Sequence, residues 1–254
     1  MNPSQRRNEI VNIIRERKRV HVDELAELLC ISRETIRRDL TELERSGKVQ
    51  KFHGGATLPM VTGEGPFRER MGENVLAKVA IADKAFGLIR PGTTLFIDTG
   101  STTLYFAERL CETRNLTIVT NSIEIARITA EGNTSNQVFL LGGEFHSDNR
   151  QTVGSITIEQ IHAFRAHHAV LTIGALDGRT GVMDFNINEA RIAQTMIMQA
   201  ESVTILADAN KLGRIASFKV CDLDQITSLV CDRMPDEPLS RQLTEAGVRI
   251  LTCS

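Results

Sequence analysis

The sequence predicts a mixed α/β protein of two domains, a small and mainly helical N-terminal domain followed by a larger domain with a mainly parallel sheet. Two patterns predict this. The first 57 residues contain three helix-like segments and then a short basic stretch. From about residue 93 onward, short apolar segments alternate with amphipathic ones, as in sheets covered by helices on both faces. A length of 254 residues with 41% hydrophobic residues also suits two domains better than one small module.

The segment 31–56 is rich in Lys and Arg and has clear helix signals. Ser32 is a good N-cap residue. Ile36, Leu40 and Leu43 recur at helical spacing and predict a buried stripe. The opposite side and its flanks are polar and mostly basic, and comprise Glu34, Thr35, Arg37, Arg38, Thr41 and Arg45.

The surroundings of this helix indicate a winged helix-turn-helix. Helices are expected at 3–17 and 23–29, Gly47 is expected to end the basic helix, and residues 48–52 are expected to form a strand that turns at 53–55. The first 57 residues carry 12 Lys and Arg against 9 Asp and Glu, whereas the rest of the chain carries 18 against 23. Attraction to nucleic acid is therefore expected only at the N-terminus.

A basic helix of this kind fits the DNA major groove, where arginines bind guanine edges or phosphates and hydroxyls fix the register. The candidate DNA contacts are Ser32, Arg33, Thr35, Arg37, Arg38, Lys51 and His53. The alternative is a solvated helix face with ion pairs, in which Glu34 pairs with Arg38. The preceding helix, the tight turn and the basic wing favour DNA binding.

Residues 58–72 contain Pro, Gly and mixed charge without periodicity, which predicts a linker, so that the second domain spans 73–254. A helix is expected at 73–89. Strands are expected at 93–97, 116–119, 137–141, 169–173, 203–206, 228–230 and 248–251. Helices are expected at 102–110, 123–129, 188–199 and 240–246.

Polar residues follow the predicted strands, where open α/β sheets bind ligands. The loops are DTGSTT at 98–103, TNS at 120–122, GGE at 142–144, GALDG at 174–178 and DANK at 208–211. Glycines admit close backbone approach, hydroxyls and helix-start amides donate to anions, Lys211 adds a compact positive charge, and Asp98 and Asp177 accept from sugar hydroxyls. Each loop alone is equally consistent with an ordinary capped turn, but together they predict a pocket for a small phosphorylated polyol or sugar.

Other classes have little support. The five cysteines have no metal-binding or disulfide-framework spacing, and the histidines lack helical metal spacing. No stretch approaches the ~18 apolar residues of a membrane span, and the N-terminus lacks an apolar signal core. We therefore expect a soluble cytoplasmic protein with no metal, no cofactor and no membrane partner.

Residues 1–57 resemble the N-terminal domain of the DeoR family of bacterial repressors, through Ser32, the TIRRDL segment 35–40, Leu43, Gly47 and the wing HGGA at 53–56. The loops of the second domain extend the resemblance over nearly the whole chain. The family implies a sensor domain resembling ribose-5-phosphate isomerase, a phosphorylated-metabolite effector, operator DNA as partner, and no catalytic residues. The residues assigned to effector binding by loop position or resemblance are Asp98, Gly100, Ser101, Thr102, Thr103, Thr120, Asn121, Ser122, Gly142, Gly143, Gly174, Asp177, Glu189, Asp208 and Lys211.

Two positions depart from the family pattern. His146 stands where an Arg is common, so that Arg150 is a candidate substitute, and His168 stands where an acidic residue is common. One alternative function is a sugar-phosphate isomerase or lyase, with Asp98, Asp177, Glu189 and Lys211 as acids and bases. Another is a nucleoid-type DNA binder. The N-terminal domain favours a regulator. We expect it to be a homodimer or homotetramer that binds repeated half-sites on DNA.

Overall fold

The computed structural model describes residues 3–17, 19–45, 49–57, 65–132 and 135–253. The chain divides into two compact units, Met1–Val61 and Thr62–Ser254, and each is described by itself. The division falls inside the linker predicted at 58–72. Residues 58–64 of that linker, and the helix stop expected at Gly47, lie outside the described residues.

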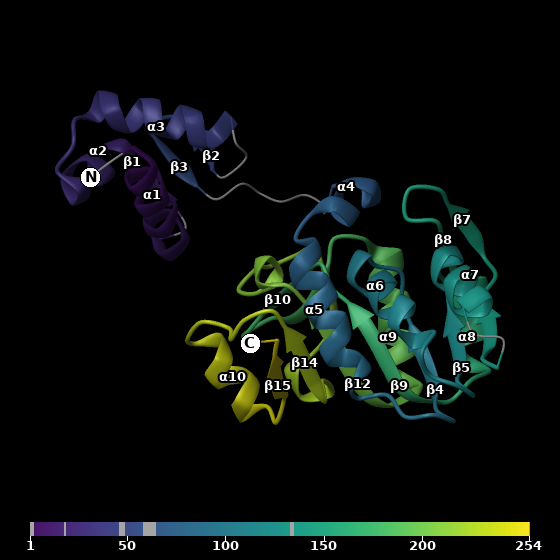
Figure 1. Ribbon diagram of the computed structural model, residues 1–254. Helices are drawn as coiled ribbons and strands as arrows, with labels where there is room; N and C mark the ends of the chain where they lie inside the picture. The colour runs from purple at the N-terminus through teal and green to yellow at the C-terminus, as the bar shows by residue number, and fades with distance from the viewer. Residues whose placement is uncertain (1–2, 18, 46–48, 58–64, 133–134, 254) are drawn as a thin grey trace. The chain divides into compact units, whose positions relative to one another are not determined.

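The N-terminal unit is a winged helix-turn-helix (Figure 1). Its elements are α1 (Pro3–Arg17), β1 (Arg19–His21), α2 (Val22–Leu29), α3 (Arg33–Arg45), β2 (Gln50–Phe52) and β3 (Gly55–Thr57). The three short strands pair antiparallel in the order β1-β3-β2, so that β2 and β3 form the wing.

The expected apolar stripe of α3 forms part of the hydrophobic core of this unit. Ile36, Leu40 and Leu43 are at most 2% exposed and pack with buried residues of α1 and α2. Gly55 in the wing allows β3 to lie against β1, because a Cβ at this position would come within 2.4 Å of the Val20 carbonyl oxygen. Burial of the stripe therefore fixes which face of α3 is left to solvent.

The second unit is built on a seven-stranded sheet of order β15-β14-β12-β9-β4-β5-β6, in which all neighbouring pairs are parallel. The strands are β4 (Thr94–Ile97), β5 (Thr117–Thr120), β6 (Gln137–Leu140), β9 (Ala166–Thr172), β12 (Ala200–Ala207), β14 (Ser228–Cys231) and β15 (Arg249–Thr252). The helices are α4 (Phe67–Gly72), α5 (Val75–Phe86), α6 (Ser101–Leu110), α7 (Ile123–Gly132), α8 (Ser155–His162), α9 (Ile187–Met198) and α10 (Leu239–Glu245), with short 3-10 turns η1 (Ala209–Lys211) and η2 (Leu223–Gln225).

Both faces of this sheet are buried, as the apolar strands predict. Leu95 and Ile97 of β4 pack with α5, α6 and α7, whereas Phe96 between them belongs to the core that α8 and α9 cover. Figure 1 shows α5 and α6 on one face of the sheet. The alternation of side chains along a strand explains the two cores.

The small antiparallel elements were not predicted from the sequence. They are the hairpin of β7 (Glu144–His146) and β8 (Gln151–Val153), and the sheet of β10 (Ala175–Asp177), β11 (Gly181–Asp184) and β13 (Phe218–Cys221). Strands of three or four residues are too short to show a period. Residues 67–72 form α4 ahead of α5, where a linker and then a single helix at 73–89 were expected, because six residues give no helical repeat either.

The strand order places a topological switch point between β4 and β9. The chain runs from β4 outward through β5 to β6, and then returns to β9 on the other side of β4 and continues to β15. The loops that leave β4 and β9 therefore diverge at their carboxyl ends. Open α/β sheets bind ligands in the crevice that this divergence creates.

Candidate functional site

A small cavity lies at this switch point. It is lined by Asp98, Thr99, Asn121, Gln151, Thr172, Ile173, Asp184, Glu189, Ile192 and Ala193. The polar lining comes from the ends of β4, β5 and β9, from the start of β8, from the end of β11 and from the first turn of α9. The site therefore joins the parallel sheet to both small antiparallel elements.

Asp98 holds the ends of β4 and β9 together. Both of its carboxylate oxygens accept from the Thr172 backbone amide, at 3.0 and 3.1 Å. Gly100 allows this close approach, because a Cβ there would lie 2.0 Å from Thr172 Oγ1. Burial raises the pKa of Asp98 well above its usual value, and the Asp184 and Glu189 carboxylates raise it further, while the Thr172 amide opposes them.

A hydrogen-bonded row of side chains crosses the cavity from β4 to α9. Thr99 Oγ1 donates to Asn121 Oδ1 at 3.3 Å, and Asn121 Nδ2 donates to Gln151 Oε1 at 3.2 Å. Gln151 Nε2 in turn donates to Glu189 Oε1 at 2.8 Å. The same Glu189 oxygen accepts from Asn149 Nδ2 at 2.7 Å. The row presents fixed donors and acceptors in a buried space, which is how a pocket selects a hydroxylated ligand.

Three carboxyl groups gather at this cavity, and the pKa of each is raised. Burial raises the pKa of Asp184, with the Glu189 charge adding to the effect, and burial also raises the pKa of Glu189. The Arg70 guanidinium acts in the opposite direction on both. Carboxyl groups of this kind accept from hydroxyls when ionised and donate when protonated, so the cavity suits a polyol.

Of the residues expected to bind effector, the structure brings Asp98, Asn121 and Glu189 to the cavity. Others are buried close by in the sequence: Ser101, Thr102 and Thr103 begin α6, Thr120 ends β5, and Ser122 directly precedes α7. Thr103 Oγ1 donates to the carbonyls of Asp98 and Gly100, at 3.0 and 3.1 Å, and so shapes the loop after β4.

The predicted glycines serve packing in this structure. A Cβ at Gly142 would meet Gln160, one at Gly143 would lie 2.1 Å from Thr157 Oγ1, and one at Gly174 would lie 2.9 Å from the Phe185 ring. Asp177 closes the β10–β11 turn, where its Oδ1 accepts from the amides of Arg179 and Thr180 at 3.0 and 3.2 Å. None of these four residues is among the lining residues of the cavity.

Asp208 and Lys211 lie one strand farther along the sheet, after β12, and they too are absent from the cavity lining. Asp208 caps η1 through the Asn210 amide at 2.9 Å. Burial lowers the pKa of Lys211 to about 8, and the Arg214 charge adds to this. Burial also lowers the pKa of Lys78, which the Asp208 charge opposes. Lys211 and Arg214 after β12, Lys78 of α5 and the Asp208 carboxylate thus form a group of charges at the end of β12.

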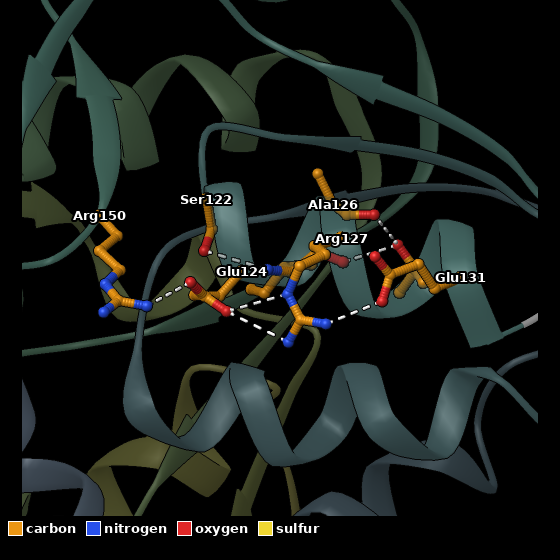
Figure 2. A network of polar contacts seen from close by, with 8 residues as sticks. Ser122, Glu124, Ala126, Arg127, Glu131 and Arg150 are labelled. Carbon is orange, nitrogen blue, oxygen red and sulfur yellow. Dashed lines mark hydrogen bonds and ion pairs between the residues drawn. The ribbon is translucent and has the colours of Figure 1, made fainter.

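Arg150 does not point its charge at the cavity. Its Nη1 donates to Glu124 Oε1 of α7 at 2.6 Å, and Figure 2 shows Arg150 and Arg127 meeting the Glu124 carboxylate from two sides. The Arg150 side chain is paired here with an acid, which disfavours it as the replacement for the family arginine. His146 lies 3.3 Å from Glu144, and its charge lowers the pKa of Glu189.

His168 belongs to the other end of the sheet. It lies near the start of β9, where its Nδ1 is 2.6 Å from Ser202 Oγ, and burial lowers its pKa. A neutral histidine paired with a serine at the amino ends of the strands has a structural explanation. His168 therefore gives no information about which ligand the cavity binds.

Thr99 lies in the predicted 98–103 loop but was not among the predicted site residues. The other groups not predicted from the sequence are Gln151, Thr172, Ile173, Asp184, Ile192 and Ala193 in the lining, and Asn149 and Arg70 behind it. Thr172 stands at the end of an expected strand and was detectable by position. Gln151, Asp184 and Asn149 lie in or beside the unpredicted short strands, so that no periodic signal marked them.

On the N-terminal unit, α3 presents arginines to solvent. Ser32 Oγ accepts from the Thr35 amide at 3.3 Å, which is the expected N-cap. The Arg38 side chain is 81% exposed and lies 3.6 Å from Glu34, the helix pair that the alternative interpretation anticipated. Arg37 is also exposed, while Asp39 is buried and binds Arg6 of α1. The exposed face is thus basic apart from Glu34 and Glu44.

The wing is connected to this helix. Lys51 Nζ donates to Thr41 Oγ1 at 3.1 Å and lies 3.7 Å from Glu44 Oε2, while the Lys51 amide donates to Glu44 Oε1 at 3.0 Å. His53 is exposed at the turn between β2 and β3. Arg33 forms an exposed pair with Asp23 at 2.7 Å.

A winged helix-turn-helix in one chain with a sensor-like α/β domain, whose polar cavity lies at the switch point of a parallel sheet, defines a ligand-responsive DNA-binding regulator. The family models agree: the DeoR-like helix-turn-helix domain matches residues 6–61, and the DeoR C-terminal sensor domain matches residues 73–233. The chain belongs to the DeoR family of transcriptional regulators.

Curated relatives match along the whole chain. The HTH-type transcriptional repressor CsqR of Escherichia coli (strain K12) is 31% identical over 97% of this chain and 94% of its own length. The glycerol-3-phosphate regulon repressor of the same strain is 30% identical over 100% of both chains. Among solved structures, ribose 5-phosphate isomerase A of Methanocaldococcus jannaschii matches 55% of each chain at 16% identity with a TM-score of 0.41, which carries no information about activity.

Two features of the described residues bear on other classes of function. No cluster of three or more histidine, cysteine or acidic side chains in this part of the chain has the geometry to hold a metal ion. In the same residues, no helix combines the length and the apolarity that crossing a membrane requires.

Proposed function

We propose that this protein is a repressor of a carbohydrate-catabolism operon, and that a phosphorylated sugar or related polyol phosphate releases it from its operator. The observation that carries the proposal is the cavity at the switch point, where Asp98, Asn121 and Glu189 face a space lined by hydrogen-bonding groups. Relatives named as repressors, one of a glycerol-3-phosphate regulon, support this ligand class.

In this proposal the carboxyl and amide groups of the cavity bind ligand hydroxyls, and the cations beyond β12 bind the phosphate. Lys211 is the compact charge suited to that role, and the helix-start amides at Ser101 and Thr102 add donors. The DNA contacts are Ser32 ahead of α3, Arg33, Thr35, Arg37 and Arg38 of α3, and Lys51 and His53 of the wing, of which all but the partly buried Thr35 are exposed. Domain limits of 1–57 and 73–254, with a linker between them, are part of the proposal.

A dimer or tetramer in the cytoplasm, joined through the second domain, would present two or more α3 helices to repeated half-sites. Effector binding would change the spacing of those helices with a coupling free energy of about 1–3 kcal/mol per site. An isomerase or lyase has less support, since the relatives are named as repressors and the chain carries a DNA-binding domain.

The test combines a thermal-shift screen of sugar phosphates and sugar acids with variants of the cavity. A true effector raises the melting temperature of the wild type and raises it much less in Asn121→Ala, which loses the amide between Thr99 and Gln151. Asn12→Ala, at an exposed position of α1, is the control. No shift with any sugar phosphate, or equal shifts in both variants, contradicts the proposed site, and turnover of a sugar phosphate supports the isomerase instead.

A further inference from the structure

The helix α4 connects the cavity to the segment that follows the DNA-binding unit. It is the first described element after residues 58–64, and it lies between the two stretches that the family models match. Its Arg70 Nη2 donates to Asn149 Oδ1 at 3.0 Å. Asn149 Nδ2 donates to Glu189 Oε1, which lines the cavity. Two hydrogen bonds therefore separate a helix next to the linker from the cavity wall.

Other contacts hold α4 on the second unit. Phe67 is 8% exposed, and the Arg70 guanidinium lies 5.4 Å from the centre of its ring. Tyr105 Oη of α6 donates to the Met71 carbonyl at 3.1 Å, and Lys78 Nζ of α5 donates to the Arg70 carbonyl. Lys78 is 3% exposed and feels the charge of Asp208. The carbonyl end of α4 thus contacts the same cation group that follows β12.

From these contacts we propose that Arg70 is a positioning residue that couples occupancy of the cavity to the attachment of α4, and through α4 to the linker and the DNA-binding unit. The inference rests on the proposed effector pocket. Arg70, Asn149 and Glu189 form the coupling relay.

A hydroxylated anion competes for both ends of this relay. Its hydroxyls donate to Glu189, whose Oε1 already accepts from Asn149 and Gln151, so that a further donor draws the carboxylate away from Asn149. Its phosphate, bound by the cations beyond β12, also offers Arg70 a charged acceptor in place of the neutral Asn149 amide, and charged acceptors make the stronger hydrogen bonds. Such differential contacts are what a ligand needs to shift a conformational equilibrium. Binding therefore exchanges the Arg70–Asn149 contact for a contact with the ligand, and so changes how α4 is attached to the second unit.

The decisive measurement is the coupling ratio, defined as the Kd for DNA with a sugar phosphate present divided by the Kd without it. Fluorescence anisotropy with a labelled fragment flanking the protein's own gene gives both values, and glycerol 3-phosphate, glucose 6-phosphate, fructose 6-phosphate and ribose 5-phosphate are the probes. The wild type is expected to show a ratio of about ten or more. Arg70→Ala and Asn149→Ala are expected to lower it to below about threefold, and Arg70→Lys to retain part of it.

Arg68→Ala is the matched control, because Arg68 is an exposed arginine on the same helix. It should keep the wild-type ratio. Ratios in Arg70→Ala and Asn149→Ala equal to the wild type overturn the inference while leaving the proposed function intact. A wild type that binds none of the four probes contradicts the proposed ligand class instead.

Hydrogen exchange of the α4 amides tests the relay without any effector. In ligand-free protein, Asn149→Ala should raise exchange over residues 67–72 while α9 remains protected, and Arg68→Ala should leave both unchanged. Unchanged exchange at α4 in Asn149→Ala overturns the inference even if no effector is found.

Discussion

At the scale of single residues, the cavity is defined by buried carboxyl groups. Asp98, Asp184 and Glu189 all hold protons more tightly than usual, because burial disfavours their charged forms and they lie near one another. The sequence indicated Asp98 and Glu189 but not Asp184, since Asp184 ends an unpredicted strand. The carboxyl groups proposed to bind the ligand therefore also lower the stability of the ligand-free protein when they are ionised.

Asp184→Asn should make stability less dependent on pH. The pKa of Asp184 is raised to about 7 by burial and by the Glu189 charge, with Asp98 nearby and Arg70 opposing. The folded state thus binds this proton more tightly than the unfolded state does, so that the contribution of Asp184 to the free energy of unfolding is most favourable below pH ~4 and falls as pH rises from ~4 to ~7. An asparagine keeps the acceptor for the Asn186 amide, which Asp184 Oδ1 binds at 2.8 Å.

Urea unfolding at pH 5 and pH 8 measures this effect. The stabilisation of the variant relative to the wild type should be larger at pH 8 than at pH 5 by about 2–3 kcal/mol, given about 1.4 kcal/mol per pKa unit over the two units between pH 5 and the folded pKa of about 7. Asp177→Asn, on the same small sheet, is the control. Identical pH slopes in wild type and Asp184→Asn would show that the carboxyl is solvated.

Lys211→Ala should weaken effector binding while operator binding persists. A charged hydrogen bond contributes about 1.5–3 kcal/mol, so the affinity for a sugar phosphate should fall roughly tenfold to a hundredfold. In the wild type, affinity should also fall as pH rises through about 8, where the Lys211 pKa lies and its charge is lost. Calorimetry at pH 7 and pH 9 measures both effects, with Lys219→Ala as an exposed control. Unchanged affinity in Lys211→Ala would show that Lys211 does not bind the phosphate and that other cations do.

At the scale of elements, periodicity predicted the long segments and failed for the short ones. The strands β4, β5, β9 and β12 were recognisable because apolar runs fill both faces of a parallel sheet. The hairpin β7–β8 and the sheet β10-β11-β13 were not, although they supply Gln151 and Asp184 to the cavity. Strand order, and hence the switch point, depends on long-range packing that one sequence does not reveal.

The helix α3 contains the arginines that should read DNA. Arg38→Ala should cost about 1–3 kcal/mol of binding to an operator and relax the preference at one base pair, if Arg38 contacts a base edge. Anisotropy titrations on the operator and on fragments with single base changes measure this. Arg127→Ala, an exposed arginine of α7, should have no effect. Equal losses on every fragment would assign Arg38 to a phosphate.

The wing is expected to add a phosphate contact through Lys51, which in the DNA-free protein lies close to Glu44. Lys51→Ala should weaken binding to all sequences and reduce the slope of log K against log salt by about 1, as for loss of one phosphate contact. Glu44→Gln, which removes the competing carboxylate charge near Lys51, should strengthen binding. An unchanged salt slope in Lys51→Ala would mean that Lys51 only connects β2 to α3.

At the scale of the whole molecule, two units with opposite charge balance are joined in one chain. The N-terminal unit offers a basic helix and wing, and the second unit offers a buried cavity next to the helix that follows the linker. The family membership makes the chain a regulator, while the effector and the direction of its influence follow from the cavity and its relay as proposals.

The central claim is that filling the cavity changes the affinity for DNA. Its most direct test is the Kd of the wild-type protein for the DNA flanking its own gene, measured at fixed ionic strength with and without the sugar phosphate that most raises its melting temperature. We predict a Kd that increases about tenfold or more, and an unchanged Kd in the presence of saturating sugar phosphate would contradict the account.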